Sequence, residues 1–193
     1  MIVFKGFKDK VVEVLKNGGV GVVPTDTIYG ISASALDRGA VGRAYSLKGR
    51  GEQKPMIVLV SSPKDLTVFG IRLNISTVKF FKKYWPGRVS VILDCPVKKY
   101  EYLHRGTKTL AFRLPAYPEL INLLKKTGPL VSTSVNPNGR EPAESIMQAK
   151  KYFDDKVDFY VDIGNLGSTP STVARLYKTG KVEIVREGDV KII

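Results

Sequence analysis

Hydrophobic positions along this chain follow two periods, and their alternation predicts short strands separated by amphipathic helices. In residues 8–17, Val11, Val12 and Leu15 fall on one face of a helix. The Asn-Gly-Gly sequence at 17–19 then favours a left-handed helix end. Residues 20–23 follow as an uninterrupted apolar run, which is typical of a buried strand.

The same pattern continues to the end of the sequence. Further helices are predicted at 37–47, 75–85, 118–126 and 142–153, and further strands at 56–60, 89–93, 109–114, 130–133, 157–161, 171–176 and 182–186. Helices of this size between strands indicate an α/β or α+β fold, and the many C-terminal strands favour a mixed sheet. Because no Pro/Gly/Ser-rich linker divides the chain, we expect residues 1–193 to form a single domain.

Composition narrows the class of protein. Hydrophobic residues make up 43% of the chain, yet no apolar run approaches the ~20 residues that span a bilayer. The first residues lack the layout of a signal peptide, and Cys95 is the sole cysteine. With His104 as the sole histidine, no soft-ligand metal site is expected, and a cytoplasmic protein without membrane association is predicted.

The charge balance suggests a polyanionic partner without proving one. Lysine and arginine total 31 against 18 acidic residues, for a formal net charge of +13. Such an excess attracts RNA and could in part serve nucleotide phosphates. A solvated basic surface accounts for the charge equally well.

Candidate chemistry begins at the end of the 20–23 strand. Pro24 stops the apolar run, and Thr25, Asp26 and Thr27 follow it. Polar loops at strand ends are where open α/β sheets build ligand sites. After the next predicted helix comes the sequence Lys-Gly-Arg at 48–50, in which Gly49 allows Lys48 and Arg50 to converge on one anion. Lys54 adds a third cation; an ordinary basic loop is the alternative for all three.

Other polar groups stand at later strand ends. The strand at 130–133 leads into the hydroxyl and amide groups of 132–139, which could bind phosphate, ribose or base, or could simply cap a surface turn. Arg113 interrupts an apolar strand, so it should meet either a ligand, slightly favoured, or an internal carboxylate. Ser171 and Arg186 are hydroxyl and cationic groups near the last two strands. The spacing of glycines matches neither a Walker loop nor a dinucleotide fingerprint.

Three features favour structural interpretations. Phe80, Phe81, Tyr84 and Trp85 have helical spacing and are expected in the core with some exposed edge. Ile75 and Val78 share the spacing of that helix. Lysines 79, 82 and 83 are expected on the solvated face of that helix, with RNA contact as the less favoured alternative. His104 lies in a predicted loop without a nucleophile motif nearby, which argues against catalysis.

Taken in order, these segments resemble the YrdC-like family of L-threonylcarbamoyladenylate synthases. The matching pieces are residues 24–30, 48–50, 54–58, 85–87, 113–115, 134–139, 171–173 and 186–188. The family's Lys-Arg-Ser-Asn signature falls on Lys48, Arg50, Ser134 and Asn136. Two departures, Val135 inside the signature loop and Leu59 where some members carry histidine, affect substrate contacts more than reaction class.

The resemblance implies a YrdC-like twisted, mixed open sheet with flanking helices around a positively charged cavity. It implies L-threonine, bicarbonate and ATP with Mg²⁺ as substrates, and threonylcarbamoyl-AMP and pyrophosphate as products. Other proteins then transfer the threonylcarbamoyl group to tRNA, with direct tRNA contact possible.

On this reading Lys48 and Arg50 are catalytic, and Thr25, Arg113 and Ser171 bind threonine. Lys48, Arg50, Thr109, Ser132, Ser134, Asn136 and Arg186 bind ATP. No protein-held metal is expected.

Two other functions stay open. The basic cavity could hold structured RNA, making the protein an RNA-binding module in tRNA or ribosome maturation without adenylate-forming activity. The third possibility is a carbamoyl-adenylate former like the related domain of hydrogenase-maturation proteins, which normally belongs to a much longer, zinc-finger-bearing chain.

Overall fold

The computed structural model describes residues 2–49, 55–167 and 169–193. Arg50, a predicted site residue, and Lys54, the third cation of the same predicted loop, lie outside the described residues. In the described part of the chain no helix is long and apolar enough to cross a membrane.

A single mixed sheet organises the described residues, in the strand order β1-β8-β2-β3-β7-β4-β6-β5-β9-β10. The strands are β1 (Ile2–Lys5), β2 (Val20–Val23), β3 (Gly30–Ser34), β4 (Ile57–Leu59), β5 (Val89–Asp94), β6 (Thr109–Arg113), β7 (Leu130–Ser134), β8 (Phe159–Asp162), β9 (Thr172–Leu176) and β10 (Val182–Arg186). The sheet contains parallel pairs, such as β1 with β8 and β4 with β6, and antiparallel pairs, such as β2 with β3. The expected mixed open sheet is therefore confirmed.

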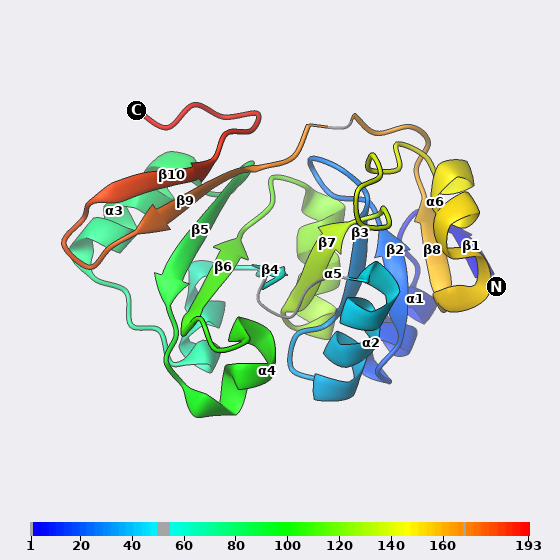
Figure 1. The fold of residues 1–193 in the computed structure, drawn as a ribbon, viewed down its shortest axis with the longest axis horizontal. Coiled ribbons are helices and arrows are strands. Elements are labelled where there is room, and N and C mark those ends of the chain that lie inside the picture. Colours follow the sequence, from blue (N-terminus) through cyan, green and yellow to red (C-terminus); the bar gives the residue numbers. More distant parts are fainter. Residues whose placement is uncertain (1, 50–54, 168) are drawn as a thin grey trace.

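Helices cover both faces of this sheet (Figure 1). The α-helices are α1 (Asp9–Lys16), α2 (Arg38–Lys48), α3 (Ile75–Tyr84), α4 (Glu101–His104), α5 (Pro118–Thr127) and α6 (Ile146–Phe153), with 3₁₀ turns η1 (Pro63–Phe69), η2 (Lys98–Tyr100) and η3 (Asp154–Lys156). α1 and α5 build one core cluster, while α2, α3, α4 and α6 contribute to a larger one. Alternation along the strands divides the side chains: Val58 enters the larger cluster and Leu59 the smaller.

Several helix ends follow the local signals in the sequence. Asp37 caps α2 by accepting a hydrogen bond from the backbone N–H of Ala40 at 3.0 Å. Gly49 then ends α2 in the left-handed region, with φ of 55°. The sharp bend expected after Lys48 is therefore present, and it fixes where the Lys48 side chain starts.

Some sequence expectations were wrong. The periodicity gave no signal for β1 or β3, and α6 begins at Ile146 rather than at 142. The core placement expected for Phe80, Phe81 and Trp85 is confirmed, whereas Ile75 is 76% exposed and Val78 37% exposed. His104 ends α4 and is buried rather than standing in an exposed loop. In each case packing between elements, which the local pattern does not contain, decided the outcome.

Candidate active site

A cavity of about 180 Å³ lies among the strand ends that carry the predicted site residues. Its described lining combines the loop between β2 and β3, the short strand β4, the end of β6, strand β7 and the segments around Ser171 and Arg186. The predicted site residues among these are Thr25, Arg113, Ser132, Ser134, Ser171 and Arg186. That lining has two guanidinium groups and no carboxylate, so it presents cations and hydroxyls to a ligand.

Arg113 is the most buried cation of the cavity, with 4% of its surface exposed. Its Nη1 donates to Thr27 Oγ1 at 3.0 Å, and its Nη2 lies 3.3 Å from Asp26 Oδ1. Burial lowers the pKa of the guanidinium, Asp26 opposes that shift, and Arg186 and Arg88 add to it. The internal carboxylate weighed as the less favoured partner of Arg113 is therefore present, and it is Asp26.

This pair keeps unused hydrogen-bonding capacity. Asp26 Oδ2 accepts from the backbone N–H of Ala116 at 2.9 Å. Within the described residues, neither Asp26 Oδ1 nor Arg113 Nε has a hydrogen-bond partner, although both are buried. Buried polar groups normally find partners, so these two atoms are exceptions among the described residues.

The loop after β2 is braced by the hydroxyl of Thr25. That hydroxyl donates to Ile28 O at 2.7 Å and accepts from the backbone N–H groups of Thr27 and Ile28. Thr25 Oγ1 also lies 3.0 Å from Thr27 Oγ1. The loop thus holds Thr27 against Arg113, a contact that reading the sequence did not anticipate.

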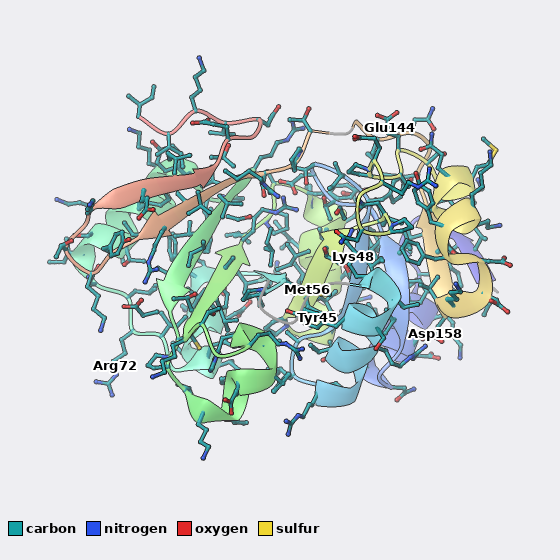
Figure 2. All side chains as sticks on the ribbon, viewed as in Figure 1. Tyr45, Lys48, Met56, Arg72, Glu144 and Asp158 are labelled. Atoms are coloured by element: carbon teal, nitrogen blue, oxygen red, sulfur yellow. The ribbon has the colours of Figure 1, made fainter. Side chains whose placement is uncertain are left out.

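Lys48 reaches the turn after β7 rather than the cavity lining. Its Nζ donates to Ser134 O at 2.8 Å, Ser134 Oγ at 3.1 Å and Asn136 O at 2.7 Å, and also contacts Asn136 Oδ1. Ser134 Oγ donates in turn to Asn136 Oδ1 at 2.6 Å. Three of the four signature residues therefore form one cluster, and Ser134 connects it to the cavity. Figure 2 shows Lys48 near the middle of the molecule, beside β7.

Hydrogen bonds to neighbouring strands hold the serines of the cavity. Ser132 accepts from Ser32 at 3.2 Å, across strands β3 and β7. A side chain at Gly30 would collide with the Ser132 hydroxyl, so glycine is needed for this close approach.

On the other side, Ser171 Oγ lies 2.9 Å from the hydroxyl of fully buried Ser90, and Arg186 donates to Ser171 O at 2.7 Å. Sequence reading missed Ser90; its signal is a lone hydroxyl inside the apolar 89–93 run.

Three described residues predicted to contact the nucleotide are absent from the described cavity lining: Lys48, Thr109 and Asn136. Thr109 opens β6, whereas Arg113 closes it, and Thr109 lines a different hollow. Asn136 lies in the Lys48 cluster and is absent from the described lining. The sequence placed Thr109 by its strand alone and could not tell which end of the strand faced the ligand.

An open α/β sheet with guanidinium and hydroxyl groups gathered at a cavity between strand ends defines a small-molecule-binding protein of enzyme type. The Sua5/YciO/YrdC family model, described as "Telomere recombination", matches residues 13–188. The chain belongs to this family.

Similar curated proteins are threonylcarbamoyl-AMP synthases. A protein of Mycobacterium tuberculosis (strain CDC 1551 / Oshkosh) named "Putative threonylcarbamoyl-AMP synthase" is 32% identical over 185 residues, which cover 91% of this chain and 85% of the relative. The threonylcarbamoyl-AMP synthase of Halorhodospira halophila is 32% identical over 154 residues, covering 79% of this chain and 80% of the relative.

Solved structures repeat the fold. E. coli YciO superposes with a TM-score of 0.83 at 26% identity, covering 97% of this chain and 93% of that one. P. abyssi Sua5 complexed with L-threonine superposes with a TM-score of 0.89 at 25% identity. This chain is covered over 97% of its length there and spans 58% of the Sua5 chain.

Proposed function

We infer that this protein is an L-threonylcarbamoyladenylate synthase, which makes threonylcarbamoyl-AMP and pyrophosphate from L-threonine, bicarbonate and ATP. The observation that carries the inference is the gathering of Arg113, Arg186 and the cavity hydroxyls at one small cavity in a chain of this family. Relatives at 32% identity bear the name of this activity, and a structural neighbour was solved with L-threonine. The product serves threonylcarbamoyladenosine formation in tRNA.

The reaction needs two bond-forming steps. The threonine amine attacks the carbon of bicarbonate, and loss of water leaves a carbamate. A carbamate oxygen then attacks the α-phosphorus of ATP, and the bond from that phosphorus to the bridging oxygen breaks to release pyrophosphate. Such nucleotidyl transfers depend on positioning and charge neutralisation rather than on a protein nucleophile. The cations and hydroxyls of the cavity suit that requirement.

Arg113 is our choice for the threonine carboxylate. Its planar guanidinium matches a carboxylate, and Arg113 lines the cavity. Thr25 and Ser171 line the same cavity, so we assign them to the threonine amine and hydroxyl. The Thr25 hydroxyl already makes hydrogen bonds within its own loop. A contact with the threonine substrate would therefore use a hydroxyl that also bonds to the backbone of that loop.

The nucleotide side is assigned to the Lys48 cluster and its neighbours. Lys48, together with Arg50 outside the described residues, would neutralise the polyphosphate. Arg186 would contact the nucleotide phosphates, and Ser132, Ser134 and Asn136 would line the nucleotide. For Thr109 the structure offers no support, because it lies at the far end of β6. In the described chain no group of three or more His, Cys, Asp or Glu side chains could hold a metal. We therefore write Mg²⁺ as part of the MgATP substrate.

The comparisons support the enzyme over the RNA-binding module that the charge allowed, because the named relatives are synthases. Transfer of the product to tRNA by other proteins and a cytoplasmic location stay predictions.

The first test is pyrophosphate release from ATP, with threonine and bicarbonate omitted in turn. Release that requires both substrates is the expected result. Release without threonine would contradict threonine selectivity, and no release from folded protein would overturn the enzyme. Lys125→Ala, which removes a cation from the exposed surface of α5, should release pyrophosphate as the unaltered protein does.

A further inference from the structure

Arg186 reaches the cavity at the strand ends, which we call the substrate cavity, from the last strand of the sheet. It is the final residue of β10, and its Nη2 donates to Ser171 O at 2.7 Å. The pairing of β10 with β9 is regular up to Ile184, and the register then shifts so that Arg186 stands opposite Val173. A bulge of this kind re-aims the side chain that follows it. Strand pairing holds Arg186 from one side only, since no residue of β10 follows it.

The chain beyond Arg186 turns back against the sheet (Figure 1). We call residues 187–193 the C-terminal strap. The strap passes very close to the start of β9: a Cβ atom on Gly188 would lie 2.4 Å from Thr172 N and 2.5 Å from Pro170 O, so no side chain fits there. The path of the strap is thus set by the segment that borders the substrate cavity.

One hydroxyl holds the C-terminal strap by two hydrogen bonds. Thr172 Oγ1 donates to Val190 O at 2.6 Å and accepts from Val190 N at 3.3 Å, so it takes the place of a backbone partner. Thr172 is fully buried, and its own N–H donates to Arg88 O at 3.0 Å beside β5. Releasing the strap would leave this buried hydroxyl without a partner, which is costly. Thr172 is therefore a firm anchor four residues beyond Arg186.

The other polar contacts of the strap are weaker. The ion pair between Arg88 and Asp189 leaves 48% and 37% of the two side chains exposed, and exposed pairs contribute little. Asp189 N donates to Pro170 O at the long distance of 3.3 Å. The contacts of Ile193 with α3 are exposed as well. The buried hydroxyl on β9 is therefore the contact that best accounts for the fixed position of the strap.

Thr172 does not itself meet a ligand. It is absent from the described lining of the substrate cavity, whereas Pro170, Ser171 and Arg186 belong to that lining. Ser171 has separate support, because its hydroxyl lies 2.9 Å from that of Ser90 on β5. An effect of the Thr172 hydroxyl on the cavity must therefore pass through the strap and Arg186.

We propose that Thr172 is a positioning residue, whose hydroxyl holds the C-terminal strap so that Arg186 meets the nucleotide phosphates. The inference rests on the proposed function, which assigns Arg186 to those phosphates. A guanidinium that is already held in place loses less freedom on binding an anion than one on a loose segment. Removing the hydroxyl should therefore weaken nucleotide binding and leave threonine binding nearly unchanged.

The test is a double-mutant cycle on MgATP binding by the full chain, measured by titration calorimetry without threonine or bicarbonate. Its variants are Thr172→Val, Arg186→Gln and the two together. Thr172→Val keeps the shape of the side chain and removes the hydroxyl, whereas Thr172→Ser keeps the hydroxyl. The matched control is Thr77→Val, which removes a buried hydroxyl on α3 that donates to Asn74 Oδ1 at 2.9 Å.

Urea denaturation checks that each variant is folded. If Thr172→Val does not fold, Thr172→Ala takes its place in the cycle, because the smaller side chain leaves room for a water molecule to bond to the strap.

We expect Thr172→Val to raise the Kd for MgATP about fivefold or more when Arg186 is present, and less than about twofold when Arg186 is Gln, because residues that act through one another are not additive. Thr172→Ser and Thr77→Val should stay within about twofold of the unaltered protein, as should the Kd of Thr172→Val for threonine. An equal effect of Thr172→Val in both backgrounds, an equal loss of threonine affinity, or a Thr172→Ser variant as weak as Thr172→Val would each overturn the proposal.

Pyrophosphate release from the same proteins separates this inference from the proposed function. Coupled MgATP binding without release would overturn the synthase and leave the positioning role of Thr172 standing. Normal release with additive effects on MgATP binding would overturn the positioning role and leave the synthase standing. An unaltered protein that binds no MgATP would overturn both.

Discussion

Two buried cations near the substrate cavity differ in the described groups that hold them. Arg113, 4% exposed, lies against the Asp26 carboxylate, so its charge is largely offset inside the protein. Lys48, 7% exposed, is held by carbonyl, hydroxyl and amide oxygens of Ser134 and Asn136. The described partners of Lys48 are thus oxygen acceptors at the signature loop, whereas Arg113 is held by a carboxylate. We propose that Lys48 contacts a polyphosphate and that Arg113 orients a carboxylate by its shape.

The contrast predicts that Arg113 depends on its neighbour for stability. Asp26→Asn keeps an acceptor for Ala116 N but leaves the buried guanidinium without a counter-charge. We expect a loss of about 3–5 kcal/mol in the free energy of unfolding, measured by urea denaturation. The control is Glu13→Gln, which breaks the exposed pair with Lys10 and should cost at most about 1 kcal/mol. A loss for Asp26→Asn no greater than for Glu13→Gln would show that Arg113 needs no internal counter-ion.

Lys48 is expected to matter chiefly for rate. Lys48→Ala removes a buried positive charge, and losing a transition-state charge contact typically costs about 2.7–4 kcal/mol, or roughly a hundred- to thousandfold in turnover. Pyrophosphate release measures the effect, and the thermal unfolding transition checks that the variant folds. The same loss is expected for Arg50→Ala. Near-normal release from both variants would contradict the assignment.

A substitution of Arg113 should weaken the binding of threonine much more than the binding of ATP. Arg113→Lys keeps the charge beside Asp26 but loses the planar fork, so the KM for threonine should rise about tenfold or more while the KM for ATP changes little. Steady-state kinetics with each substrate varied in turn decide the matter. An unchanged threonine KM, or an equal rise for ATP, would remove Arg113 from threonine binding. Arg88→Lys, in the exposed pair with Asp189, serves as the control.

The smallest effect is expected for the exposed ion pair between Arg43 and Asp158, where solvent screens the interaction. Asp158 accepts from Arg43 through both carboxylate oxygens and from the backbone N–H of Val20. Partial burial raises the pKa of this carboxyl, but the hydrogen bonds from Arg43 and Val20 outweigh it and lower the pKa overall.

Because the folded pKa lies below the unfolded one, the stabilisation is complete above the unfolded pKa and is lost as pH falls through the folded one. As the pH falls from about 5 to 2, the Asp158→Asn variant should therefore lose less unfolding free energy than the unaltered protein loses. The difference between the two losses should be below about 1 kcal/mol. Urea unfolding across that range measures it, and identical acid profiles would contradict it.

Local patterns located most of the elements and the loops that carry the site. The apolar run at 20–23 became β2, Asp37 capped α2, and the run at 130–133 became β7 with its hydroxyl-rich end. β3 was missed because Gly30-Ile-Ser-Ala-Ser34 is short, small and bounded by no strong signal. It is a strand because β2 and β7 pair with it on either side.

The sequence alone determined which chemical groups stand at the strand ends, because helical and strand periods and turn residues are local properties of the chain. Only the tertiary structure decided that Arg113 meets Asp26, that Lys48 meets Ser134 and Asn136, and that Thr109 faces a different hollow from Arg113. The partners of Lys48 lie 86 and 88 residues away from it in the sequence, and the order and register of the strands bring them into contact. Pairing between remote segments leaves no periodic trace in either segment, so it appears only when the sheet is assembled.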